Sequence, residues 1–311
     1  MTMEHHRPER ISAPRTITPL SVPAMGSVGM LRFPYAQAEL HALVKSALDE
    51  DGAFNDLTSI ATVVSDRHAR CRLVARAPGV LCGIPLALEA FRMLDPKVTM
   101  RVDCEDGARL EPGDSVLYLS GHARGLLAAE RVALNFMQRL SGVASSTARY
   151  VDAVRGTRAK ILDTRKTTPG WRLLEKYAVR AGGGTNHRLN LSTAVLIKDN
   201  HLASVDGDVG LAVRRARDLA PNGTMIEVEC DRIEQVEASL VACADIIMLD
   251  NMSTAQMKAC VDLVAGRAIV EASGGVNLDS VRAIAETGVD WISIGALTHS
   301  APALDLALDF E

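Results

Sequence analysis

Residues 163–201 read D-T-R-K-T-T-P-G-W-R-L-L-E-K-Y-A-V-R-A-G-G-G-T-N-H-R-L-N-L-S-T-A-V-L-I-K-D-N-H. This stretch holds seven arginine and lysine residues and two histidines against three acidic residues, in a chain of 311 residues with a formal net charge of -4. The cations stand beside glycine-rich or strand-like segments instead of recurring at helical spacing. The stretch therefore predicts a pocket for a small, highly anionic ligand, whereas a solvated helix face would place its charges three and four residues apart.

From residue 160 onward, apolar runs typical of strands alternate with helical patterns. The expected strands are 161–162, 194–197, 225–228, 246–249, 268–270 and 291–294, and the expected helices are 170–180, 209–220, 233–241, 254–264, 278–287 and 303–308. The last four strands recur every 20 to 23 residues. This period is typical of βα units laid parallel in a barrel. We count six units, with one more strand expected near residues 183–191, so the barrel is predicted to fall short of eight strands.

The first half of the chain has a different pattern. A helix is expected over residues 38–48, a turn over 54–59 and a second helix over 86–94; strands are expected at 68–77, 78–83, 98–104 and 115–121. A long helical segment follows over 126–154, and it places Arg131 and Asn135 on one face because they lie four residues apart. We therefore predict a flexible extension over residues 1–32, an α+β domain with its helical linker over 33–142, and an α/β barrel domain over 143–311.

Composition narrows the class of protein. The chain is 48% hydrophobic and 23% charged, which is ordinary for a globular protein. Its slight negative charge argues against a general nucleic-acid surface, and no apolar run approaches the roughly 18 residues that span a bilayer. The six cysteines form no C-x-x-C pair, so they are expected to be buried free thiols of a reducing compartment. We expect a cytoplasmic protein that binds neither nucleic acid nor membrane.

Charged or glycine-rich residues follow all six expected strands, where the active sites of barrel enzymes lie. Cations come first, carboxylates next and glycines last: Arg165, Lys166, Lys198, Glu229, Asp250, Ser273, Gly274, Gly295 and His299. Glycine-rich turns that lead into helices expose backbone N–H groups suited to phosphate. Two such turns on the last two strands therefore predict a phosphate site.

Glu229 and Asp250 suit a hard cation such as Mg²⁺, which takes one or two carboxylates and completes its shell with water and phosphate. A salt bridge at the rim is the alternative. Glu227 lies on the same strand face as Glu229 and leaves the choice between them open. Lys166 or Lys198 could also serve Schiff-base chemistry, as in class I aldolases, but the number of arginines favours clamps for carboxylate or phosphate.

The motifs T-R-K-T-T-P-G-W-R, G-G-G-T-N-H-R, I-K-D-N-H, E-V-E, L-D-N, E-A-S-G-G-V and I-S-I-G-A-L-T-H closely resemble those of the quinolinate phosphoribosyltransferases. The earlier A-E-R-V-A-L-N and D-L-T-S fit the same family, so the resemblance runs from about residue 33 to the end. It implies an α/β protein with an α+β N-terminal domain followed by an open, about seven-stranded α/β barrel. It also implies transfer of phosphoribosyl from phosphoribosyl pyrophosphate to quinolinate, with Mg²⁺, giving nicotinate mononucleotide, CO₂ and pyrophosphate, a step of NAD biosynthesis.

The resemblance also implies roles for individual residues. The quinolinate shell would be Arg131, Arg165, His187, Arg188 and Lys198, with Lys166 shared between both substrates. Glu229 and Asp250 would be the ribose and Mg²⁺ carboxylates and, with Lys166, the catalytic residues. Ser273, Gly274, Gly295 and His299 would cradle the 5′-phosphate. The family's homodimer implies that Arg131 acts in the partner subunit's site.

Three rival functions remain at this point: a paralogous phosphoribosyltransferase-like protein with another substrate, a Schiff-base barrel aldolase, and a nucleotide-binding regulatory subunit. An assay for nicotinate mononucleotide from quinolinate and phosphoribosyl pyrophosphate separates them.

Overall fold

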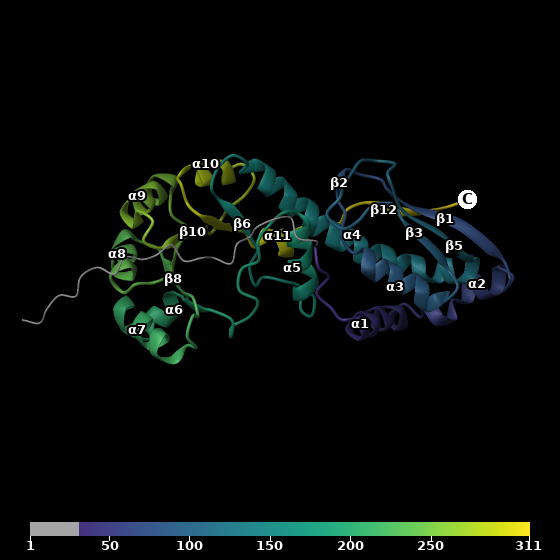
Figure 1. Ribbon diagram of the computed structural model, residues 1–311, viewed down its shortest axis with the longest axis horizontal. Coiled ribbons are helices and arrows are strands. Elements are labelled where there is room, and N and C mark those ends of the chain that lie inside the picture. Colours follow the sequence, from purple (N-terminus) through teal and green to yellow (C-terminus); the bar gives the residue numbers. More distant parts are fainter. Residues whose placement is uncertain (1–30) are drawn as a thin grey trace, which may run out of the picture. The chain divides into compact units, whose positions relative to one another are not determined.

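The computed structural model describes residues 31–311, and Arg32–Glu311 form one compact unit (Figure 1). The predicted extension over residues 1–32 lies outside the described residues apart from its last two. Within the described residues, two larger sheets and one small strand pair form the framework.

The first sheet is antiparallel, with the order β12-β1-β5-β3. Its strands are β1 (His68–Ala75), β3 (Thr99–Val102), β5 (Ser115–His122) and β12 (Leu306–Phe310), and β2 (Gly79–Val80) pairs separately with β4 (Arg109–Leu110). The helix predicted over residues 303–308 is wrong. Residues 303–305 are irregular and residues 306–308 belong to β12, which pairs with β1 from Cys71 to Ala75. An isolated helix of six residues is marginal, whereas the edge of β1 offers a full set of backbone partners to an extended chain.

Helices cover this sheet, and most of them match the predicted ranges. They are α1 (Gln37–Glu50), α2 (Leu57–Thr62) and α3 (Ile84–Leu94), with a short 3₁₀ turn at Ala53–Asn55. The turn predicted over 54–59 is in part the start of α2, because the Asp56 carboxylate accepts the N–H groups of Thr58 and Ser59 and so caps that helix.

Helix α4 (Ala123–Ala153) is 31 residues long and packs against α3 and against α5 (Arg172–Ala181). Its apolar stripe, including Leu126, Met137 and Leu140, is fully buried. Arg131 and Asn135 share one face of the helix, as their spacing predicted, and both are exposed. Helix α4 thus contacts strands β1, β5 and β12 of the first sheet as well as α5.

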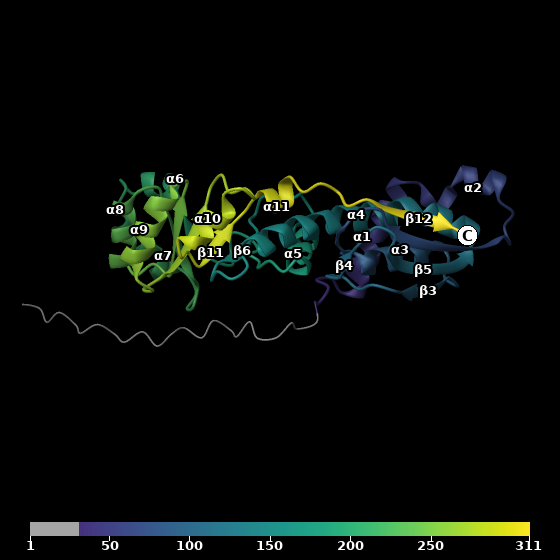
Figure 2. The ribbon, with the colours of Figure 1, turned by 90° about the horizontal axis from the view of Figure 1, so that it is seen from above.

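The second sheet is parallel, with the order β6-β11-β10-β9-β8-β7. Its strands are β6 (Lys160–Leu162), β7 (Val195–Ile197), β8 (Ile226–Cys230), β9 (Ile246–Asp250), β10 (Ile269–Ser273) and β11 (Trp291–Ser293). The accompanying helices are α5 (Arg172–Ala181), α6 (Asp199–Ala203), α7 (Val209–Leu219), α8 (Ile233–Val241), α9 (Thr254–Val264), α10 (Val281–Glu286) and α11 (Ala296–His299). Helices α7, α8 and α9 follow one another along the outside of the strands (Figure 1), and Figure 2 shows the same helices from above.

The open α/β barrel is confirmed, but among the described residues it has six strands and not seven. The strand expected over 183–191 is reduced to one parallel bridge between Leu162 and Thr185. Two of the three glycines before it explain why the chain passes so close to α4. A Cβ on Gly182 would meet the Ala144 carbonyl oxygen at 2.3 Å, and one on Gly184 would meet the Thr147 side chain at 2.7 Å.

All six cysteines are free, as expected. Four are buried, but Cys104 is only half-buried and Cys243 is exposed, so the prediction of burial is wrong for these two. Within residues 31–311, no helix is long and apolar enough to cross a membrane.

Candidate functional site

A cavity of about 600 Å³ opens at the carboxyl ends of the parallel strands. It is lined by Thr164, Arg165, Lys166, His187, Arg188, Leu196, Lys198, Glu229, Met248, Asp250, Asn251, Ser273, Gly274, Gly275 and Ser293. Nine of the predicted site residues are therefore brought together in one place: Arg165, Lys166, His187, Arg188, Lys198, Glu229, Asp250, Ser273 and Gly274. The volume is within the usual range for sites that hold small molecules.

Four cations line the wall formed by the 163–201 stretch: Arg165, Lys166, Arg188 and Lys198. Burial, together with the charge of Arg165, lowers the pKa of Arg188 from its ordinary value. The Arg188 Nη1 donates to the carbonyl oxygen of Ala194 at 2.9 Å, and the Arg165 Nε is buried without a partner. Gathering like charges is unfavourable unless an anion joins them, so this wall is built for an anionic ligand.

A buried ion pair holds the backbone of His187. Lys176 Nζ lies 2.6 Å from Asp163 Oδ1, and the two side chains are 5% and 0% exposed. Asp163 Oδ1 also accepts the His187 N–H at 2.8 Å, and Lys176 Nζ donates to the His187 carbonyl oxygen at 3.0 Å. Because both backbone groups of His187 are held, the loop that carries His187 and Arg188 has a fixed path into the cavity.

Beneath the cavity, His187 Nε2 lies 3.2 Å from Glu227 Oε2 and 3.5 Å from Glu271 Oε2. Both carboxylates are almost fully buried. Burial alone lowers the pKa of His187, but the nearby carboxylates of Glu227 and Glu271 outweigh it and raise the pKa to about 10. Burial in turn raises the pKa of Glu227.

A hydrogen bond at the other ring nitrogen of His187 opposes this charge. Nδ1 accepts the backbone N–H of Arg188 at 2.8 Å, which a protonated Nδ1 could not do. That single bond is worth about 1 kcal/mol, whereas two buried carboxylates favour the cation by several kcal/mol. We therefore expect the imidazolium.

The side chains of His187, Glu227 and Glu271 could also offer ligands to a metal ion, since one atom of each lies within 4.8 Å of the others.

Glu227 and Glu229 differ in their depth below the opening of the cavity. Both side chains lie on one face of β8, but Glu229 lines the cavity and Glu227 does not. Glu229 pairs with Lys198, and Asp250 accepts a hydrogen bond from Asn251 Nδ2 at 2.7 Å. Glu229 and Asp250 are the two carboxylates among the residues that line the cavity.

The glycine-rich turns lie beside these groups. Gly274 has φ +90°, and a Cβ there would lie 2.2 Å from Asn251 Oδ1. Gly295 and His299 are not among the residues that line the cavity. A Cβ on Gly295 would meet Lys166 Cδ at 2.9 Å and the His299 ring at 3.3 Å, so the Lys166 stem and the His299 ring both lie close to Gly295.

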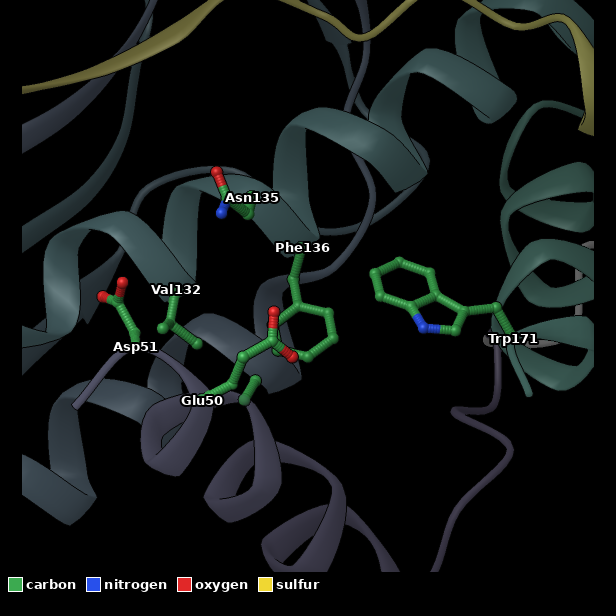
Figure 3. Close-up of a pocket in the computed structure, with 7 residues that line it drawn as sticks. Glu50, Asp51, Val132, Asn135, Phe136 and Trp171 are labelled. Atoms are coloured by element: carbon green, nitrogen blue, oxygen red, sulfur yellow. The ribbon is translucent and has the colours of Figure 1, made fainter. Parts of the chain in front are cut away.

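Arg131 is not in this cavity. Its side chain is 58% exposed on α4, and its nearest acidic oxygen is that of Glu130 at 3.8 Å. The same helix lines a separate cavity of about 210 Å³, where the Phe136 ring stacks on Trp171 with centroids 5.2 Å apart (Figure 3). Glu50 and Asp51 also face it, and it holds none of the predicted site residues.

Six lining residues were not among the predicted site residues: Thr164, Leu196, Met248, Asn251, Gly275 and Ser293. The period of two along a strand could have found two of them. Leu196 lies two residues before Lys198, and Met248 two residues before Asp250, so each shares a sheet face with a residue that was predicted.

Comparisons of this chain with family models, with curated proteins and with solved structures all point to one family. The model of the quinolinate phosphoribosyl transferase C-terminal domain matches residues 143–309, and that of the N-terminal domain matches residues 56–141. A nicotinate-nucleotide pyrophosphorylase [carboxylating] of Mycobacterium leprae is 46% identical over 86% of this chain and 95% of its own. Solved nicotinate-nucleotide pyrophosphorylases from Ehrlichia chaffeensis and Francisella tularensis are 43% and 36% identical, with TM-scores of 0.83 and 0.84. They cover 89% and 90% of this chain, which in turn covers 99% and 98% of theirs.

Proposed function

Because the chain belongs to the quinolinate phosphoribosyltransferase family, we propose that it transfers the phosphoribosyl group of phosphoribosyl pyrophosphate to quinolinate. The products are nicotinate mononucleotide, CO₂ and pyrophosphate. One observation carries the proposal most directly: four cations on one wall of a single cavity face two carboxylates at the ends of β8 and β9. The free cysteines support a cytoplasmic location.

The cation wall suits the dicarboxylate. Arg165, Arg188 and Lys198 would pair with the two carboxylates of quinolinate, with the His187 imidazolium behind them, and charge-assisted bonds of this kind are the strong ones. The Lys166 ammonium would bridge to the pyrophosphate of the second substrate. The wall would thus bring the pyridine nitrogen to the ribose carbon C1, and such positioning supplies much of the rate in a two-substrate reaction.

The carboxylate side suits the sugar. Glu229 or Asp250 would stabilise positive charge that develops at C1 as pyrophosphate leaves. The same two residues would hold Mg²⁺, which when bound neutralises charge on the pyrophosphate. Once the pyridine nitrogen carries the ribose, its positive charge makes loss of the adjacent carboxylate easier. Ser273, Gly274, Gly295 and His299 would hold the 5′-phosphate.

The test is an assay with quinolinate, phosphoribosyl pyrophosphate and Mg²⁺ that measures nicotinate mononucleotide and CO₂. Nicotinate in place of quinolinate is the control and should give no product. Lys166→Ala should abolish turnover and leave the thermal unfolding midpoint unchanged, because Lys166 is exposed. Full activity of that variant would contradict the assignment of Lys166.

We further propose that the active form is a homodimer in which Arg131 enters the partner subunit's site. Its exposure and its absence from its own cavity support this. Mixing inactive Arg131→Ala and Lys166→Ala proteins would test it. If Arg131 acts across the interface, each mixed dimer contains one intact site, and random mixing should restore about a quarter of full activity. No recovery in a mixture whose subunits demonstrably exchange would show that Arg131 acts within its own chain.

A further inference from the structure

The segment that carries Lys166, residues 163–168, belongs to no helix or strand. Its backbone is nevertheless held by side chains from elsewhere. The carbonyl oxygen of Lys166 accepts a hydrogen bond from Thr298 Oγ1 at 2.7 Å. The N–H of Thr168 donates to Glu175 Oε2 at 3.1 Å. An irregular segment that is held at Lys166 and again two residues later is more rigid than its lack of secondary structure suggests.

Glu175 is the centre of this arrangement. It lies on α5 and is 0% exposed. Its Oε1 accepts from Thr168 Oγ1 at 2.9 Å and pairs with Arg139 Nη2 at 2.8 Å. A buried carboxylate is costly unless it is paired and hydrogen-bonded, and here both oxygens are satisfied. Two of its three donor groups, the N–H and the hydroxyl of Thr168, belong to the segment that carries Lys166.

Arg139 connects the two contacts. Its guanidinium, on α4, also donates to the carbonyl oxygens of Ala301, at 2.9 Å, and of Thr298. Thr298 is the residue whose hydroxyl holds Lys166. Arg139, Glu175 and Thr298 therefore form one continuous network from α4, α5 and α11 that ends on the backbone around Lys166.

The Lys166 side chain itself is left available. Within residues 31–311, no acidic group forms an ion pair with its ammonium. Its aliphatic stem passes over Gly295, where a Cβ would come within 2.9 Å of Lys166 Cδ. The backbone is thus fixed and the stem has a prepared path, while the charged end is free to meet a ligand in the cavity.

We propose that Glu175 is a positioning residue for Lys166, acting through Thr168 and, by way of Arg139, through Thr298. The inference rests on the proposed function, in which Lys166 binds the anionic substrates. Displacing a charged group by about 1 Å can cost about 100-fold in rate. The network is built to prevent such a displacement without touching the substrate.

Glu175→Gln tests the idea, because it keeps the shape of the side chain and removes the charge that pairs with Arg139. We expect kcat/KM to fall about 10- to 100-fold. Thr298→Val cuts the second link and leaves Glu175 in place, so it should lower kcat/KM in the same direction even if the first variant folds poorly. Glu89→Gln is the matched control: Glu89 is also a buried glutamate on a helix, but its partners are His41, Gln37 and Arg92. It should leave kcat/KM unchanged.

A double-mutant cycle separates positioning from a general structural role. Quinolinate binding is measured by calorimetry for the wild type, Glu175→Gln, Lys166→Ala and the double variant. If Glu175 acts through Lys166, Glu175→Gln should weaken binding about tenfold when Lys166 is present and less than about twofold when it is absent. Equal weakening in both backgrounds would overturn the inference and leave the proposed function standing. Unchanged binding by Lys166→Ala alone would instead overturn the role of Lys166 on which the inference rests.

Discussion

Replacing Lys176 by methionine should show how much the buried ion pair beneath the cation wall contributes to stability. The change keeps the length of the side chain and leaves the Asp163 carboxylate buried, with only the neutral donors His187 N–H and Asn186 Nδ2. Removing one member of a buried pair costs about 3–5 kcal/mol. Since both Asp163 oxygens keep one partner, we expect about 3 kcal/mol, and the unpaired His187 carbonyl adds about 1 kcal/mol.

Urea unfolding followed by tryptophan fluorescence would measure this loss of about 4 kcal/mol. Two comparisons make the result specific. Lys45→Met removes an exposed pair with Asp49 and should cost about 0.5 kcal/mol or less. The double variant Asp163→Asn with Lys176→Met removes both charges and should be more stable than Lys176→Met alone. A loss below about 1 kcal/mol for Lys176→Met, or a double variant less stable than the single one, would refute the reasoning.

Three further results are expected. Gly274→Ala should lower kcat/KM by more than about tenfold in steady-state assays, because the new methyl would meet Asn251 Oδ1 at 2.2 Å and φ is +90°; activity like that of the wild type would argue against a rigid turn there. Gly182→Ala should cost about 1–3 kcal/mol in urea unfolding, because its Cβ would lie 2.3 Å from a carbonyl oxygen of α4. NMR should find His187 still protonated at pH 8, since its pKa is raised to about 10. The contribution of the His187 proton to folding stability is complete below pH 6.5, the ordinary pKa of histidine, and is lost as the pH rises toward 10. Glu271→Gln should lower the pKa of His187. A neutral His187 ring at pH 8 would contradict the raised pKa.

Much of this architecture follows from local patterns in the sequence. The parallel strands were predictable because each is a short apolar run at a regular interval, and their ends gave most of the cavity residues. Strand β12 could not be predicted, because its backbone partner is β1, more than 200 residues earlier in the chain. This long-range pairing overrode the local helical pattern of residues 303–308. Glu227 and Glu229 could not be ranked by alternation alone, since depth along the barrel depends on how the neighbouring strands are staggered.

The residues that support the site could not be identified from the sequence either, because their contacts join distant parts of the chain. Arg139 and Glu175 are 36 residues apart, and neither stands in a motif that suggests their contact. An arginine on a helix and a glutamate on the next helix are ordinary surface residues in any sequence. Only packing of α4 against α5 buries the glutamate and gives the pair its function.

The stretch of residues 163–201 therefore has two roles: some of its side chains line the cavity, and others hold the backbone in place. Its cations do not all face a ligand: four line the cavity, whereas Lys176 is buried against Asp163 and Arg172 donates to Thr167 Oγ1 and to the carbonyl oxygen of Leu189. Two of its three acids, Asp163 and Glu175, are fully buried and bind the backbone of the two segments that carry Arg165, Lys166 and Arg188, three of the four cavity cations. A cluster of like charges can be held ready for an anion only if the segments that carry it cannot move apart. The buried acids supply that restraint, so removing either one should impair the site although neither lines it.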